Sequence, residues 1–227
     1  NTSTIGNGTT AVLTSLAITS ADAAVVTTGD ITSSGADAVT SVALTTTGAN
    51  SKISHSDINL GASAVASFNL NVAANSHFFP PSAKTITMGT VTAGAITIGD
   101  YATIGTNAST TIDAEFTKLT MTIGTGVTWT NDIILTTADT ANTELVVTLN
   151  TGAEAIDFNT GAGDEFRIVG TTNAFTLDES DFEKMTVNFN GTGAIKWTAS
   201  NASTSLSVSG AGGIDSLTGG AGNDTLR

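Results

Sequence analysis

A short hydrophobic pattern recurs along the chain: an apolar residue, any two residues, an apolar residue, one residue, and a third apolar residue. It is clearest at Leu13–Ile18, Val39–Leu44 and Val65–Leu70. Further copies begin at Phe116 and Phe182, and weaker ones at Val91 and Asn142. The intervals between the seven starts are 26, 26, 26, 25, 26 and 40. The pattern therefore defines a repeat of about 26 residues, and the last interval indicates an insertion of about 14 residues.

Two further apolar runs lie inside each repeat. One follows a Gly or Asn turn, as before Ile53 and Trp129, and the other precedes the next copy, as at Ile31 and Ile58. Short runs with alternating character are typical of strands with one buried face. Three strands that return to the same phase in every repeat predict an all-β, right-handed parallel β-solenoid with about 26 residues per coil. The alternative is a Thr-rich β-sandwich, whose strands have a similar spacing.

In such a solenoid, equivalent residues of successive coils stack at the inter-strand spacing of about 4.8 Å. Leu44 would then stack on Leu70, and seven or eight coils would form a rod of roughly 35–40 Å. The segment Asn75–Ser82 is expected to be a surface loop, because Pro80 and Pro81 cannot donate hydrogen bonds to a strand ladder.

Composition and charge narrow the classes of function. The 227 residues include 44 Thr and 24 Gly, and 20 acidic residues against 7 basic ones give a net charge of −13. This balance argues against a partner such as nucleic acid or an anionic membrane surface. No apolar run approaches a membrane span of about 20 residues, and the absence of Cys excludes disulfides and thiolate metal sites. The first residue is Asn1 and the last lies inside a motif, so we expect a segment of a longer protein.

The C-terminal residues carry the motif with the most specific chemistry. Residues 219–227 match the nonapeptide G-G-x-G-x-D-x-U-x, and residues 210–218 lack only its second Gly. Gly permits left-handed turns that aim backbone carbonyls inward, and Asp adds a carboxylate beside them. These are hard oxygen ligands suited to Ca²⁺. Two copies in phase make a far stronger signal than one.

This block resembles the RTX family of secreted calcium-binding proteins. The resemblance implies a C-terminal β-roll in which each ion lies between turns, with carboxylates from repeats two steps apart. The calcium-loop residues it implies are Gly210, Gly213, Asp215, Gly219, Gly220, Gly222 and Asp224. The preceding repeat has Leu206 where the motif has Asp, so complete sites are expected to need residues after Arg227.

A degenerate pair of nine-residue repeats lies upstream. Both begin with Thr-Gly-Ala, at Thr151 and Thr160, and we interpret residues 151–168 as a degenerate calcium loop. Its candidate ligands are Asp157, Asp164 and Glu165. A solvated acidic turn is the alternative at equal weight. The predicted organisation is a Thr/Ala/Gly-rich solenoid over residues 1–209, followed by a truncated RTX block over residues 210–227.

In the segment Phe182–Val187 and in its Thr/Ala/Gly-rich composition, the chain resembles RTX-type bacterial surface-layer proteins. This resemblance implies a secreted protein at the cell surface of a Gram-negative bacterium, exported by type I secretion and ordered by Ca²⁺ outside the cell. We therefore expect a structural role, with self-association into a lattice or filament and cell-surface polysaccharide as a further partner.

Little in the sequence indicates catalysis, and we expect no enzyme activity. His55 and His77 are the only histidines, and surface or loop positions are expected for both. Two alternatives remain open. One is a segment of a large RTX adhesin that binds a surface or polysaccharide, which regular Thr ladders on a flat face would favour. The other is a β-helix enzyme that degrades polysaccharide, which a cleft with carboxylates beside Lys or Arg would favour, or else the calcium-binding tail of a secreted protease or lipase. The tail version predicts a catalytic domain outside this segment.

Overall fold

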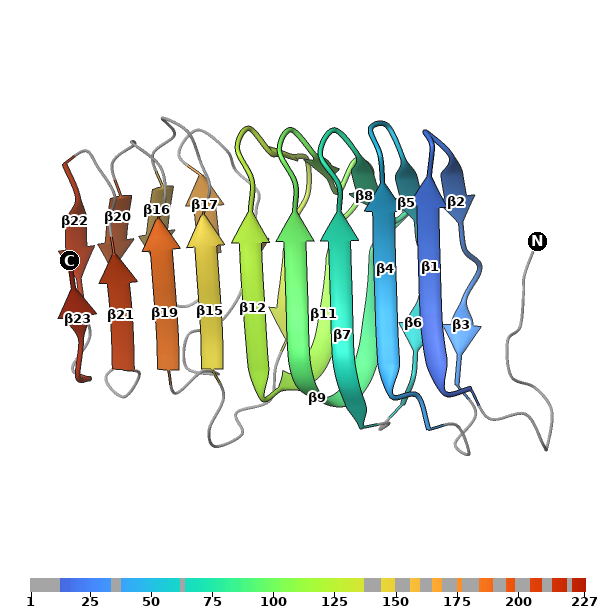
Figure 1. The fold of residues 1–227 in the computed structure, drawn as a ribbon, viewed down its shortest axis with the longest axis horizontal. Helices are drawn as coiled ribbons and strands as arrows, with labels where there is room; N and C mark the ends of the chain where they lie inside the picture. The colour runs from blue at the N-terminus through green and yellow to red at the C-terminus, as the bar shows by residue number, and fades with distance from the viewer. Residues whose placement is uncertain are drawn as a thin grey trace.

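The computed structural model consists of parallel strands wound into a solenoid (Figure 1). It describes residues 13–33, 38–61, 64–136, 144–149, 156–159, 165–168, 175–176, 184–189, 195–198, 205–209, 214–219 and 222–227. Within these ranges we find no helix able to cross a membrane. Each early coil contributes one strand to each of three walls, which we call the front sheet, the side sheet and the back sheet.

The three sheets are defined by the strands that pair in them. The front sheet contains β1 (Ser15–Ala21), β4 (Ser41–Thr47), β7 (Val65–Val72), the second part of β9 (Lys84–Ile98), β12 (Lys118–Ile123), β15 (Glu144–Leu149), β19 (Lys184–Phe189), β21 (Ser205–Ser209) and β23 (Thr225–Leu226). The side sheet contains β2 (Val25–Thr27), β5 (Lys52–Ser54), β8 (His77–Phe79), β10 (Thr103–Ile104) and β13 (Thr128–Trp129).

The back sheet begins with β3 and continues toward the C-terminus. Its strands are β3 (Ile31–Thr32), β6 (Ile58–Asn59), the first part of β9, β11 (Thr110–Phe116), β14 (Ile133–Thr136), β18 (Phe175–Thr176), β17 (Glu165–Ile168), β16 (Ile156–Asn159), β20 (Ile195–Thr198) and β22 (Ser216–Thr218). The long strand β9 crosses from the back sheet to the front sheet, which joins the two into one hydrogen-bonded sheet.

The registers of the front sheet confirm the predicted repeat. Neighbouring strands pair Ser15 with Ser41 and then Ser67, so the residue number rises by 26 at each step. At the steps that follow it rises by 26, 25, 26 and 40, the same intervals that separate the hydrophobic copies. Leu44 lies beside Leu70 as predicted. The pairings are parallel, so the sandwich alternative was wrong.

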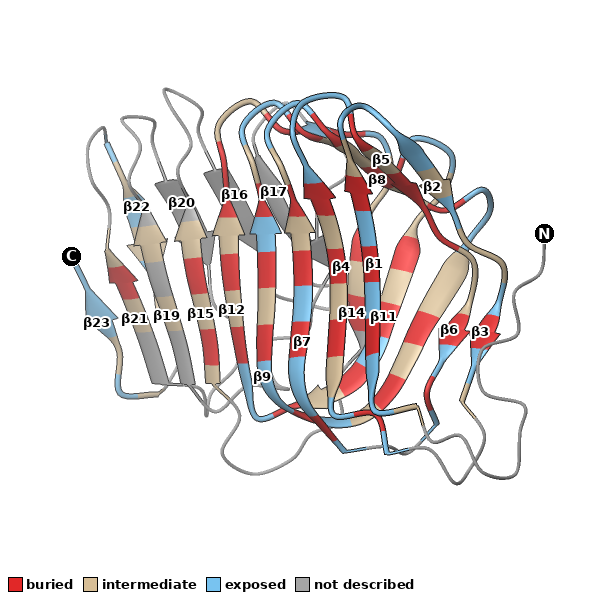
Figure 2. Cartoon of the chain, turned by 45° about the vertical axis from the view of Figure 1, so that its right-hand side comes forward, coloured by how far each residue is buried: buried red, intermediate tan, exposed pale blue. Residues whose placement is uncertain are grey.

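Inward-facing apolar residues of the three sheets form one continuous core (Figure 2). Along β4, buried and partly exposed residues alternate, as a strand with one inner face requires. Equivalent core residues then stack from coil to coil: Leu16 lies beside Val42, which lies beside Phe68. A single coil has too little apolar surface to form a core, so stacking supplies it.

Two expectations about loops and coils need correction. The segment Asn75–Ser82 is not an excursion, because it contains strand β8, whose Phe78 is fully buried. Pro80 and Pro81 follow that strand and end it, so their lack of an N–H removes no ladder hydrogen bond. The structure also places all three strands in five successive coils, fewer than the predicted seven or eight, since the side sheet has five strands among the described residues.

The predicted insertion lies between β15 and β19, which nevertheless pair directly and bring Leu145 beside Met185. Part of it is an antiparallel hairpin of β16 and β17, followed by β18, which pairs antiparallel with β17. After this point the described strands alternate between the front and back sheets. The difference in number between paired residues falls to 21 for β19 with β21, to 20 for β20 with β22, and to 18 for β21 with β23.

Candidate functional site

The C-terminal motif lies on the last described strands of the solenoid. Asp215 immediately precedes β22 and Asp224 immediately precedes β23, so both carboxylates stand where a turn enters a strand. The two strands lie on opposite sheets, because β22 pairs with β20 and β23 pairs with β21. The register of β21 with β23 places Ser207 beside Thr225, a step that equals two nonapeptides per turn.

The carboxylate of Asp224 folds back over its own loop. A Cβ atom added at Gly219 would collide with the carboxylate oxygen Oδ2 of Asp224, with its Cγ atom 2.8 Å away. In the last nonapeptide, the Asp side chain thus occupies the space that a side chain at the first Gly would take. Its carboxylate is a hard oxygen donor of the kind that Ca²⁺ binds.

The other predicted calcium residues are described only in part. Gly222 lies in the turn before β23, whereas Gly210, Gly213, Gly220 and Asp164 lie outside the described residues. Asp157 is in β16 and Glu165 is the first residue of β17, and the hairpin pairs them with Arg167 and Asn159. The two acidic residues therefore lie on antiparallel strands, not in stacked parallel repeats. Their role as calcium ligands stays a prediction.

Among the residues that the structure describes, no three Asp, Glu or His side chains are placed to hold a metal ion together. Asp215 and Asp224 are both partly exposed. The residues present fit a calcium loop in chemistry, because Asp215 and Asp224 each supply a carboxylate at a Gly-rich turn.

A second polar cluster, which sequence reasoning missed, surrounds His55. Its imidazole is completely buried and stacks on the Phe78 ring, with centroids 4.9 Å apart and planes at 17°. Nδ1 lies 3.0 Å from the carbonyl oxygen of Ser56, and Nε2 lies 2.8 Å from Oγ1 of Thr110. Since a carbonyl only accepts, the neutral ring donates from Nδ1, and Nε2 accepts from the Thr110 hydroxyl.

His55 therefore lies in the loop after β5, one of the two expected placements, but it is buried and not on the surface. The pKa of His55 lies below its ordinary value chiefly because burial disfavours the charged ring, which outweighs the hydrogen bond to Ser56 and the nearby Asp57 carboxylate. The fold explains the burial: His55 directly follows β5 and packs against Phe78 of the next coil. No pattern in the sequence separates such a His from a polar loop residue.

Beside this ring, Lys84 stands between two carboxylates from successive coils. Its Nζ lies 2.7 Å from Asp57 and 3.8 Å from Asp30. The backbone N–H of Thr85 donates to the same Asp57 carboxylate at 2.9 Å. The hydrogen bond from Lys84, followed by that from Thr85, lowers the pKa of Asp57, while Asp57 raises the pKa of Lys84. The carboxylates of Asp30 and Asp57 thus bind groups of neighbouring coils and link these coils together.

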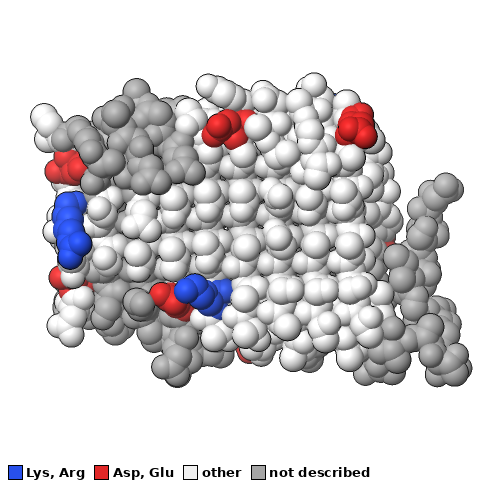
Figure 3. Space-filling model, viewed as in Figure 1, with Lys and Arg blue, Asp and Glu red and all other residues white. Residues whose placement is uncertain are grey.

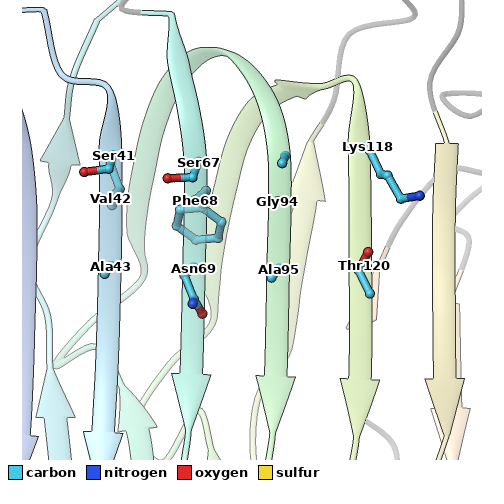
Figure 4. A pocket seen from close by; sticks show the side chains of 11 residues that line it. Ser41, Val42, Ala43, Ser67, Phe68, Asn69, Gly94, Ala95, Lys118 and Thr120 are labelled. Atoms are coloured by element: carbon cyan, nitrogen blue, oxygen red, sulfur yellow. The ribbon is translucent and has the colours of Figure 1, made fainter.

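The outward face of the front sheet is the broadest regular surface of the molecule. Figure 3 looks onto this sheet and shows neither acidic nor basic side chains over its centre, with the charges toward the margins. A shallow hollow of about 520 Å³ crosses β4, β7, β9 and β12. Figure 4 shows the residues around it: Ala43 and Ala95 carry small outward side chains, and the larger Asn69 and Lys118 lie on β7 and β12.

Comparison of the chain with known proteins finds no match. No family model, no curated protein and no solved structure matches it. The functional reading therefore depends on the C-terminal motif, the solenoid and the surfaces described above.

Proposed function

We propose that this chain is a structural, non-catalytic segment of a secreted cell-surface protein of the RTX type, stabilised by Ca²⁺. In this proposal the solenoid is right-handed, as crossovers between parallel strands nearly always are. It runs into an RTX β-roll at its C-terminal end. Copies associate into a surface layer or extracellular matrix on a Gram-negative bacterium after type I secretion.

The observation that carries the proposal is the geometry of the last repeat. The nonapeptide over residues 219–227 coincides with one turn and one strand, β23, and two such units span the step from Ser207 on β21 to Thr225 on β23. The Asp224 carboxylate packs on Gly219, the first Gly of that nonapeptide. Bound Ca²⁺ would neutralise these carboxylates and couple binding to folding of the loops.

The charge of the chain gives a physical reason for the ion. The net charge is −13, and 15 of the 20 acidic residues follow residue 110. Excess negative charge destabilises a compact state through self-repulsion, and a divalent cation relieves it. Export as an unfolded chain followed by folding on contact with extracellular Ca²⁺ is consistent with this arrangement and with the absence of Cys.

Circular dichroism and light scattering, first with EGTA and then with millimolar Ca²⁺, test the proposal. We expect Ca²⁺ to increase the β-sheet signal and the particle size. The Asp215→Asn/Asp224→Asn variant should lose this response. Asp113→Asn is the matched control, because it removes an exposed carboxylate from β11 at a distance from the motif and should respond like the wild type. A response that is absent from the wild type, or unchanged in the double variant, would refute the calcium role.

One observation favours the adhesin alternative. The outer positions of the front sheet align Thr97, Thr122 and Thr148 on β9, β12 and β15, and Thr19 and Thr45 on β1 and β4 continue this column across Asn71. A flat face with a regular hydroxyl ladder is the feature expected of a surface-binding module. Retention of the chain on insoluble polysaccharide, and its loss when Thr97 and Thr122 become Val, would support this second function.

The enzyme alternative gains less. The carboxylates Asp30 and Asp57 do lie beside Lys84, the combination that an enzyme cleaving acidic polysaccharide would use. Their contacts, however, are with Lys84 and with the backbone of the neighbouring coils. We therefore propose that this cluster is structural. A Lys84→Met variant should change the stability of the fold, and it should not cleave polysaccharide.

A further inference from the structure

We propose that two copies of this chain pack face to face through the outward surface of the front sheet. We call this surface the front face. Its clearest part consists of the outward residues of four adjacent strands, namely Ser15, Ala17, Thr19, Ser41, Ala43, Thr45, Ser67, Asn69, Asn71, Ala93, Ala95 and Thr97. The inference rests on the proposed structural function, and it adds the surface and the partner.

The first argument is charge. Two molecules that each carry a net charge of −13 repel one another at most approaches. None of the twelve outward residues of β1, β4, β7 and the second part of β9 is charged. The next strand brings Lys118, whose Nζ lies 3.1 Å from the Glu144 carboxylate of β15, so this pair is neutral as a unit. A second copy therefore meets little electrostatic repulsion at the front face.

The second argument is area. Eight strands from β1 to β21 stack side by side in the front sheet. At about 4.8 Å per strand and about 20 Å of strand length, they cover roughly 38 Å by 20 Å, or about 750 Å². A stable interface of standard size buries about 800 Å² on each partner. Two front faces in contact thus reach the area that a specific dimer needs.

The third argument is shape. The outward side chains are small, and they align in columns, with Ala17, Ala43, Asn69 and Ala95 in the central one. Small side chains let two sheets approach closely, and the columns of aligned side chains give each face regularly spaced ridges. A two-fold axis brings the same surface of both copies into contact. In that arrangement the larger Asn69 of one copy faces the hollow over Ala95 of the other.

The test adds like charges to the front face of the full chain. Ala43→Glu/Ala95→Glu places two carboxylates in the central column of each copy, so a face-to-face dimer would bury four added negative charges in its contact. The matched control is Thr32→Glu/Thr111→Glu, which adds the same charge to outward positions of the back sheet. Circular dichroism establishes that both variants are folded. Sedimentation velocity at about 1 to 100 µM then measures association, in EGTA and in Ca²⁺.

We expect the wild type and the back-sheet control to form dimers in EGTA as well as in Ca²⁺, because the uncharged part of the front face, over β1, β4, β7 and β9, lies apart from the nonapeptides. The front-face variant should dissociate at least tenfold more readily, since like charges in a contact are costly. A wild type that remains a monomer at 100 µM, or a front-face variant that dimerises normally, overturns the inference. The same holds if a monomer binds insoluble polysaccharide through this face. A calcium response with no dimer contradicts the front face alone, and a dimer with no calcium response contradicts the calcium role alone.

Discussion

At the scale of single residues, the core is matched by size between coils. Phe68 lies beside Gly94 in the next coil, and Gly94 lies beside Leu119. The space above Gly94 is filled by the ring of Phe116, whose centroid lies 6.2 Å from that of Phe68. A Cβ at Gly94 would stand 2.5 Å from Phe116 and 2.9 Å from Leu119. The missing side chain in this copy of the repeat is therefore compensated by a Phe.

Gly94→Ala should lower the free energy of unfolding by about 1–3 kcal/mol, the usual cost of overpacking a core. In a Phe116→Leu background, the aromatic atoms that meet the new methyl group are absent, so the same change should cost less. We expect a coupling of about 0.5–3 kcal/mol between the two sites. Urea denaturation of the four proteins measures it, and additive effects would contradict the proposed packing.

Acidification should destabilise the fold through His55. Its folded-state pKa is lowered by burial, so below the ordinary value near 6.5 the unfolded chain takes up a proton that the folded chain does not. The free energy of unfolding should therefore fall between pH 7 and pH 5.5, with a slope of up to about 1.4 kcal/mol per pH unit. Denaturation in this pH range measures the slope.

The control for this prediction is the other histidine. His77 is only partly buried, and its pKa is lowered by this burial and by Lys52, so it contributes in the same direction but less. His55→Gln should remove most of the slope, and His77→Gln should leave most of it. Equal slopes in both variants would show that the buried ring is not the source.

At the scale of elements, the turn from the front sheet to the side sheet repeats a left-handed residue from coil to coil. Asn50, Asn75, Tyr101 and Gly126 stand at equivalent positions of four successive coils and have φ of 64°, 56°, 56° and 65°. Asn tolerates this conformation better than other side chains, and Gly adopts it at no steric cost. The exposed Tyr101 ring lies over Gly126, where a Cβ would stand 2.7 Å from it.

Gly126→Ala should therefore carry two penalties, about 1–2 kcal/mol for the left-handed backbone and a further cost for the collision with Tyr101. Gly61→Ala is the matched control, because Gly61 has φ of 60° and nothing within 4 Å of an added Cβ. Thermal unfolding should show a larger loss for Gly126→Ala, and Tyr101→Ala should remove the difference. Equal losses with Tyr101 present would contradict the account.

The elements differ in how far the sequence predicts them. The front sheet follows from the hydrophobic repeat, because each copy supplies the inward residues of one strand, as Val42 and Leu44 do in β4. Strand β8 was missed because Pro80 and Pro81 mask a short strand that ends just before them. The hairpin of β16 and β17 was read as two repeats, since period-2 patterns do not distinguish parallel from antiparallel pairing.

The candidate sites divide in the same way. The nonapeptides were found because their residues are close in sequence, and the position of Asp224 over Gly219 is consistent with that reading. The buried His55 and the ion pairs of Lys84 with Asp30 and Asp57 were missed, because their partners lie one or two coils away in the sequence and meet only when coils stack. An apolar period gives the stacking but not which polar side chains then meet.

At the scale of the whole molecule, we propose that the chain joins two parts with different means of stabilisation. Five coils with three strands bury a continuous apolar core. After Lys184 the turns shorten, as the registers of β21 with its two neighbours show, and Leu226 and Ile214 are exposed. The described side chains of β22 and β23 are partly or fully exposed, and we propose that Ca²⁺ supplies at these turns the stabilisation that packing supplies in the early coils.

Hydrogen exchange measured by mass spectrometry, in EGTA and in millimolar Ca²⁺, tests this central claim most directly. We predict that the amides of β4 and β7 are protected under both conditions, because their coils are held by the apolar core. The amides of β22 and β23 should exchange rapidly in EGTA and slowly in Ca²⁺. Protection of β22 and β23 that is the same with and without Ca²⁺ would contradict the account.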